Sequence, residues 1–259
     1  MCLRNTTTTA VFAVLAGCGP TVASMSEECE RGNGETCHAL VTLYSWGRDP
    51  TGKLQGELPP KDEALAFRYA ELGCRAEHAA SCRSLAWSYH YGHGTAVDKV
   101  KSIASNDKAC ELGNGVGCGY AGLERLEQGD SVPAKAPLER GCSVLSDSLS
   151  CYVLASQFPA PTETKVALYK KACELEPTDG SGCWAGGALL ASTPEGLEQA
   201  LPLLKIACQR MGSSSRACLD AQSVEAGRVL FTQEICGATP EGETVCWRQE
   251  PGNPWGMPL

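Results

Sequence analysis

The sequence predicts an all-α fold, an α-solenoid in which helix-turn-helix repeats stack on one another and disulfides hold them together. Three observations indicate this fold. Cysteines recur in local pairs, amphipathic segments with a helical period separate the pairs, and aromatic residues make up only 6% of the 259 residues. So few large side chains suit many thin contacts between helices better than one thick core.

The cysteines form the most regular pattern in the chain. Of the 16 cysteines, Cys2 and Cys18 lie in the N-terminal segment, and the others form seven consecutive pairs. The members of each pair are eight to ten positions apart: Cys29/Cys37, Cys74/Cys82, Cys110/Cys118, Cys142/Cys151, Cys173/Cys183, Cys208/Cys218 and Cys236/Cys246. An even number of cysteines in an oxidising compartment indicates a disulfide framework, and the local repetition suggests that each pair forms one bond.

Metal binding and redox chemistry are the alternatives for these cysteines. Zinc sites usually take cysteines separated by two to four residues, and thioredoxin-like sites take C-x-x-C. The sequence contains no C-x-x-C. Structural disulfides therefore fit the spacing best, and closing a loop of roughly ten residues stabilises a fold by about 2.5 to 3 kcal/mol in the chain-entropy model.

The N-terminal segment bears on the compartment. Arg4 precedes the apolar run AVFAVLAG, which is too short to span a bilayer and fits the apolar region of a secretory signal. The end of this run, residues 15–18 (LAGC), resembles a bacterial lipobox, in which the preceding peptide is removed and the cysteine is acylated. The resemblance implies a signal peptide at residues 1–17, lipidation at Cys18 and a lipidated linker at residues 18–28.

A plain signal peptide cut near Ala23 or Ser24 is the alternative to lipidation. Gly19 follows the cysteine, where an Asp would signal retention in the inner membrane, so the sequence favours the outer membrane. Several acyl chains on one residue anchor a protein stably. We therefore expect an exported protein at the cell envelope, held to the membrane by lipid only.

Between the cysteine pairs the sequence predicts pairs of amphipathic helices. Residues 81–92 (SCRSLAWSYHYG) predict one helix, and a glycine-rich turn leads to Asp98, an N-cap candidate. From Asp98 a second helix runs to Gly113, with apolar residues at a rough 3.6-residue period. Similar segments recur every 30 to 45 residues, roughly, which is typical of a solenoid of helical repeats.

These motifs resemble the Sel1-like repeat (SLR) in its cysteine-rich bacterial form. The resemblance rests on ALYKKACELEPTDGSGC (167–183), DKACELGNGVGC (107–118) and YHYGHGTAVDKVKS (89–102), and it covers about residues 29–220. It implies a TPR-like superhelix of about six helix pairs. It also implies that each disulfide joins the end of one repeat's second helix to the start of the next repeat's first helix.

The sequence also departs from the repeat pattern. Pro133 and Pro137 predict that the second helix of the third repeat starts late or is short. The repeats from Cys118 onward lack the Y-x-x-G-x-G turn. Residues 221–259 read as a divergent C-terminal cap or tail with one disulfide, Cys236–Cys246, and with an irregular, Pro- and Gly-rich end.

The predicted function is non-enzymatic binding. The net charge of −8 and the pI near 5.1 disfavour nucleic acid, because a phosphate backbone would be repelled. A solenoid recognises partners by surface shape, so we expect a scaffold for a protein or peptide ligand, or for cell-wall components, without a cofactor. The candidate binding hot spots, each of which is as well explained by packing between helices, are Trp46, Trp87, Trp184, Trp247 and Trp255.

Two sequence features raise the question of chemistry. Some cysteine-rich SLR proteins are assigned penicillin-binding or β-lactamase-like activity, so a weak hydrolase is the alternative function. Ser105 and Lys108 form one S-x-x-K, but the partner motifs S-D-N and K-T-G are absent from the sequence. His90 and His93 bracket a turn with a spacing that a metal ion can use, yet such residues more often belong to a helix end. We therefore assign no catalytic, cofactor-binding or metal-ligating residue.

Overall fold

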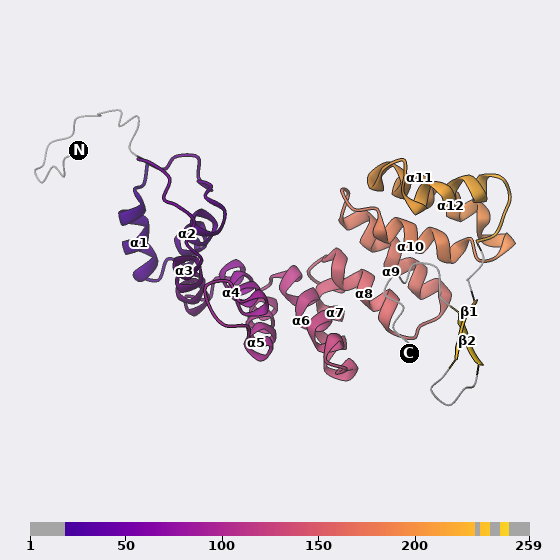
Figure 1. The fold of residues 1–259 in the computed structure, drawn as a ribbon, viewed down its shortest axis with the longest axis horizontal. Helices are drawn as coiled ribbons and strands as arrows, with labels where there is room; N and C mark the ends of the chain where they lie inside the picture. The colour runs from indigo at the N-terminus through magenta and orange to yellow at the C-terminus, as the bar shows by residue number, and fades with distance from the viewer. Residues whose placement is uncertain (1–18, 231–233, 239–243, 249–259) are drawn as a thin grey trace, which may run out of the picture. The chain divides into compact units, whose positions relative to one another are not determined.

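The computed structural model describes residues 19–230, 234–238 and 244–248 (Figure 1). Within these residues the chain forms twelve α-helices, one short 3-10 helix and one two-stranded hairpin. It divides into two compact units, of which the first ends at Asn114 and the second begins at Gly115. The expected signal peptide, the lipobox, the lipidation site Cys18 and Trp255 lie outside the described residues.

The prediction of an all-α repeat array is confirmed. The described helices of the first unit are α1 (Val22–Glu30), α2 (Gly34–Trp46), α3 (Glu63–Arg75), α4 (Ala79–Tyr91) and α5 (Lys99–Glu111). Those of the second unit are α6 (Gly115–Glu127), α7 (Ser131–Ser143), α8 (Ser148–Gln157), α9 (Thr162–Leu175), α10 (Ser181–Leu190), α11 (Leu197–Met211) and α12 (Arg216–Glu225). A 3-10 turn, η1 (Pro194–Gly196), precedes α11.

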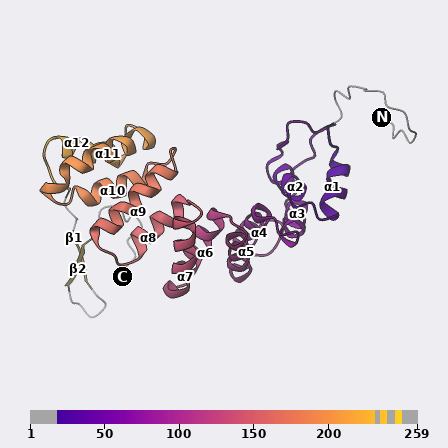
Figure 2. The ribbon, with the colours of Figure 1, turned by 180° about the vertical axis from the view of Figure 1, so that it is seen from behind.

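Helices that follow one another in the chain pack side by side within each unit (Figure 2). The pairs α2/α3, α4/α5, α6/α7, α8/α9 and α10/α11 each form one repeat, and we name the members helix A and helix B. The twelve described α-helices pack in consecutive order within each unit, which agrees with the expected number of about six helix pairs; at the two ends of the array, α1 packs against α2 and α12 against α11. Helices A of adjacent repeats also touch, α2 with α4 and α6 with α8.

The helix ends follow from the local sequence. Asn33, Asp62 and Asp98 are N-caps, and each side chain accepts a hydrogen bond from the backbone N–H three residues later. The prediction that Asp98 caps a helix is thus confirmed. At the other end of helices α2 and α4, Gly47 and Gly92 adopt φ of 63° and 81°, which glycine does without strain.

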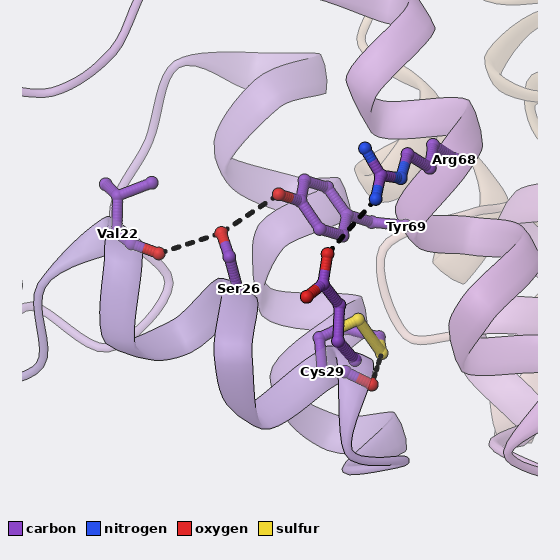
Figure 3. Close-up of polar contacts among 7 residues, drawn as sticks. Val22, Ser26, Cys29, Arg68 and Tyr69 are labelled. Atoms are coloured by element: carbon purple, nitrogen blue, oxygen red, sulfur yellow. Dashed lines mark hydrogen bonds and ion pairs between the residues drawn. A yellow bond between two sulfur atoms is a disulfide. The ribbon is translucent and has the colours of Figure 1, made fainter.

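Helix α1 occupies most of the segment that we expected to be a linker, residues 18–28. Its Met25 is only 3% exposed, so the segment contributes to the core of the first unit. The Ser26 hydroxyl donates a hydrogen bond to the Val22 carbonyl (2.9 Å) and shares another with the Tyr69 hydroxyl of α3 (2.9 Å) (Figure 3). This segment therefore belongs to the helical array.

The expectation of a short or late helix in the third repeat is wrong, since α7 is 13 residues long, the same length as α6. Pro133 lies in the first turn, where the missing N–H has no helical acceptor. Pro137 lies inside the helix and removes one hydrogen bond, the one to the carbonyl four residues earlier. Buried Leu138 packs directly after it, and such apolar packing offsets the loss.

Buried disulfides lie where one helix ends and the next begins. The bonds are Cys29–Cys37, Cys74–Cys82, Cys142–Cys151, Cys173–Cys183 and Cys208–Cys218. Their Cα atoms are 4.4 to 4.8 Å apart, so each bond holds two helix ends in close contact. Cys110 and Cys118 are disulfide-bonded too, and their pairing with each other stays a prediction.

Small residues precede the cysteines at these joints. A Cβ at Gly73 would clash with the Ser81 side chain and lie 2.9 Å from the Cβ of Cys37. At another joint, a Cβ at Gly182 would lie 2.7 Å from the backbone nitrogen of Cys173. The helices therefore approach closely only because one of the two facing residues has no side chain.

After α12, the described residues form a hairpin of two antiparallel strands, β1 (Glu234–Ala238) and β2 (Thr244–Arg248). We expected a stapled cap or tail here, without strands. The backbone register places Cys236 opposite Cys246, while the side chains of both strands, with the predicted seventh disulfide and Trp247, lie outside the described part of the chain. None of the described helices is long and apolar enough to span a bilayer.

Candidate protein-binding surface

The two complete helices A of the first unit end in the same way. Trp46 is the last residue of α2 and Tyr91 the last residue of α4, and each is followed by a glycine in the left-handed conformation. The glycine turns the chain away from the helix axis, which leaves the preceding ring uncovered. Trp46 is 61% exposed and Tyr91 is 51% exposed.

Further rings extend this exposed group along α4 and into the turn that follows. The Trp87 ring, one helical turn before Tyr91, lies 4.2 Å from it between centroids and is 37% exposed. The rings of His90 and His93 lie 4.4 and 5.9 Å from Tyr91. We call Trp46, Trp87, His90, Tyr91 and His93 the aromatic surface.

Polar contacts hold the imidazoles of the aromatic surface in place. Lys99 Nζ donates a hydrogen bond to His90 Nε2 (2.9 Å), and His93 Nδ1 lies 3.1 Å from Glu63 Oε1. Because Lys99 donates, His90 presents an unprotonated nitrogen to it. The surface therefore combines ring faces with a charged rim, as protein-binding patches do.

The acidic groups near this surface serve the backbone. The Lys101 N–H donates to the Asp98 carboxylate (3.0 Å) and holds the pKa of this carboxyl below its usual range. The N–H groups of Leu54 and Thr51 do the same for Asp49 in the loop after α2. These carboxylates are committed to a helix start and to a turn.

No protein-family model and no curated protein matches the chain. Among solved structures, it resembles a protective antigen of uropathogenic Escherichia coli that displays an SLR fold, with 19% identity and a TM-score of 0.65 over 82% of this chain. The match spans 45% of the length of the Escherichia coli protein. A Sel1 repeat protein from Oxalobacter formigenes matches with 18% identity and a TM-score of 0.56, over 76% of this chain and 87% of its own.

The chain has the SLR fold. The helix pairs and buried disulfides described above are therefore those of an SLR solenoid. This likeness concerns the fold alone, and the function has to be inferred from the chain's own surface.

The SLR array separates the three candidate tryptophans whose side chains the structure describes. Trp46 and Trp87 are exposed in the first unit, whereas Trp184 is partly buried and donates from Nε1 to Asp220 Oδ2 (2.9 Å). The prediction left open whether Trp184 binds or packs, and the structure assigns it to packing. Sequence reasoning missed Tyr91, although its place directly before a helix-ending glycine is a readable signal.

The residues considered for chemistry are buried or have other contacts. Ser105 of the S-x-x-K motif is 9% exposed within α5, so a substrate has little access to its hydroxyl. His90 and His93 contact Lys99 and Glu63, respectively. Within the described residues, no group of three or more His, Cys, Asp or Glu side chains is arranged to hold a metal ion.

Proposed function

We propose that this chain is an exported, lipid-anchored scaffold that binds a partner protein or peptide at the cell envelope through the aromatic surface of its first unit. The observation that carries the proposal is the exposure of Trp46 and Tyr91 at the ends of two helices in contact. Exposed aromatic groups rimmed by polar residues are typical of binding sites, and Trp and Tyr are the commonest hot-spot residues.

The solenoid supports this role because it holds the surface rigid. Buried disulfides fix the starts of α2 and α4, the two helices that carry Trp46 and Tyr91, so the partner need not order these helices when it binds. The number of disulfides suits an oxidising compartment outside the cytoplasm. Anchoring through Cys18 would place the first unit close to the membrane, since only residues 19–21 lie between the lipid and α1.

Site-specific photocrosslinking in intact cells tests the binding site. A photoreactive amino acid at position 46 or 91 should capture the same partner, while one at Val132, which is 87% exposed on α7 of the second unit, should not. Trp46→Ala and Tyr91→Ala should each weaken the purified complex about tenfold or more, because hot-spot truncations cost about 2 kcal/mol. Equal capture at all three positions would contradict the proposal.

Lipid anchoring is tested separately. Metabolic labelling with a palmitate analogue should mark the wild-type chain, and Cys18→Ser should abolish both the label and the membrane fraction. Labelling that persists in Cys18→Ser, or its absence from the wild type, would contradict the anchored location and leave the binding site to its own test.

A further inference from the structure

Two imidazoles meet where the first two repeats join. His38 follows Cys37 in the first turn of α2, and His78 lies directly before α4. Their ring centroids are 5.5 Å apart. His38 Nδ1 is buried and has no hydrogen-bond partner within the described part of the chain. A proton on His38 would therefore place a charge in a poorly solvated position beside a second imidazole.

His78 has an unusual task for a histidine, because it is the N-cap of α4. Its Nδ1 accepts a hydrogen bond from the Ser81 N–H at 3.3 Å and lies 3.0 Å from the Ser81 hydroxyl. Only an unprotonated nitrogen has a lone pair for this bond. The matching caps of α2 and α8 are Asn33 and Asp147, whose oxygens still accept hydrogen bonds at mildly acidic pH.

The joint around this cap is tightly packed. Ser81 is fully buried, its hydroxyl lies 3.5 Å from the Gly34 carbonyl of α2, and its side chain occupies the space next to Gly73 of α3. The His78 side chain in turn packs against Gly34 at the start of α2. Loss of the cap would disturb the contacts among three helices.

Charged groups on the elements around α2 are engaged in contacts of their own and do not compensate a proton on His38. On α1, Glu28 accepts from Thr36 Oγ1 at 3.2 Å, and on α3, Glu71 lies 4.0 Å from Arg75 of the same helix. On α4, the cation Arg83 lies over the Trp87 ring. Burial first, and the nearby His78 second, lower the pKa of His38.

We propose that protonation of His38 loosens the joint between the first two repeats, which His78 caps, so that acid weakens binding at the aromatic surface. The inference rests on the proposed function, because Trp46 and Tyr91 end the same two helices, α2 and α4, that this joint holds together. Above the ordinary imidazole pKa of about 6.5, His38 is neutral and the joint is intact.

The sign follows from the lowered pKa of His38. Below pH 6.5, roughly, the unfolded chain binds a proton that the folded chain refuses. The stabilising effect of a neutral His38 is therefore complete above this pH and is lost as the pH falls through the lowered pKa of the folded state. Acidification destabilises the joint.

Hydrogen exchange of the full chain tests the joint without any partner. Between pH 7.5 and 5.0, the protection factors of amides 81–91 should fall about tenfold in the wild type. They should stay within about twofold in His38→Leu/His78→Asn, since leucine at position 38 takes up no proton and the Asn oxygen keeps the cap of α4. His93→Asn, which removes an imidazole outside the joint, is the control for this exchange measurement alone and should lose protection as the wild type does. Equal losses in the double variant and the wild type would overturn the proposal.

The link to binding needs a second readout. Partner capture at position 46 should fall between pH 7.5 and 5.0 in the wild type but not in the double variant. Capture that is pH-independent while the joint loosens would overturn the regulation. Absence of specific capture at pH 7.5 would instead count against the proposed binding function. The exchange measurement would still show whether acid loosens the joint.

Discussion

The two units share one framework but direct their aromatic side chains differently. In the first unit, Trp46 and Tyr91 stand exposed at the ends of α2 and α4. In the second unit, Trp184 donates to a buried carboxylate, and the Tyr152 ring packs edge-on against Tyr169 at 5.4 Å. Burial raises the pKa of Tyr152 to about 12.

The difference shows that the repeat framework does not determine the use of a repeat. The disulfides and close helix contacts recur in both units, whereas the residues just after the second cysteine and at the end of helix A vary. Where these residues are aromatic and buried by a neighbouring helix, they stabilise the packing between the helices. Where they are exposed, a partner can contact them. Under the proposed function, the first unit therefore supplies the binding surface, while the aromatic side chains named in the second unit stabilise the fold.

The largest expected effect tests the shared framework. Replacing Cys74 and Cys82 by Ala, or Cys173 and Cys183 by Ala, should lower the free energy of unfolding by about 3 kcal/mol in either unit. Because repeats contact their neighbours only, limited proteolysis should cut near the altered joint. Chemical denaturation measures the loss, and a clearly smaller loss in one unit would show that the units do not rely equally on their disulfides.

Arg210 distinguishes the longer joint of the second unit. Its Nη1 lies on α11 and donates to the carbonyls of Cys173 (2.7 Å) and Glu176 (3.1 Å), at the end of α9 and in the loop that the Cys173–Cys183 bond closes. Arg210→Ala should cost about 2 kcal/mol, because charge-assisted bonds to backbone carbonyls are lost. Thermal denaturation measures this cost.

Lys205→Ala is the matched control for Arg210. Lys205 lies on the same helix and forms an exposed ion pair with Glu225 at 2.8 Å, so its loss should cost less than about 0.5 kcal/mol. Equal effects of the two substitutions would mean that Arg210 has no special role in holding this loop.

A pair of tryptophan substitutions tests the contrast between the units directly. Trp184→Phe removes the donor to Asp220, which is 5% exposed, and should cost about 1 to 2 kcal/mol. Trp87→Phe keeps an aromatic ring at a half-open position and should change stability by less than about 0.5 kcal/mol. A larger loss for Trp87 than for Trp184 in urea denaturation would reverse the assignment of packing and binding roles.

The smallest expected effect concerns two helix caps with opposite pH dependence. Burial raises the pKa of Asp147, the cap of α8, so its ionisation costs stability as the pH rises from about 3.8. Asp147→Asn keeps the cap and should stabilise the fold at pH 7, by about 0.5 kcal/mol, but not at pH 3. Asp98→Asn in the first unit should instead destabilise the fold at pH 7 but not at pH 3, because the pKa of Asp98 is lowered. Denaturation midpoints at pH 7 and pH 3 measure both changes. Changes in stability of the same sign for the two variants at pH 7 would contradict this account.

Much of the fold was predictable because it depends on local spacing. The cysteine period and the Asp98 cap are short-range signals, and the array follows from them. Helix α1 was missed because its place in the array depends on contacts such as Ser26 with Tyr69, 43 positions away, which the local sequence does not show. The same reason applies to α7, whose Pro137 is tolerated through packing that the local sequence does not show.

The candidate surface was only partly predictable. Trp46 and Trp87 were among the candidates, but exposure depends on which neighbouring helix covers a ring, and Trp184 differs from them only in that respect. The imidazole pair escaped notice because His38 and His78 are 40 positions apart and meet only when the repeats stack.

The small residues beside the disulfides restrict how SLR repeats can be rearranged. At two joints the glycine lies on the earlier helix, where Gly73 faces Ser81 and Gly141 faces Ser150; at a third joint it lies on the later helix, where Gly182 faces Ala172. Moving a repeat from one kind of joint to the other would place two side chains against each other, or two glycines opposite each other. The order of repeats therefore depends on these small side chains. A shuffled or shortened array should assemble only where a glycine of one helix still faces the Ser or Ala of the next helix.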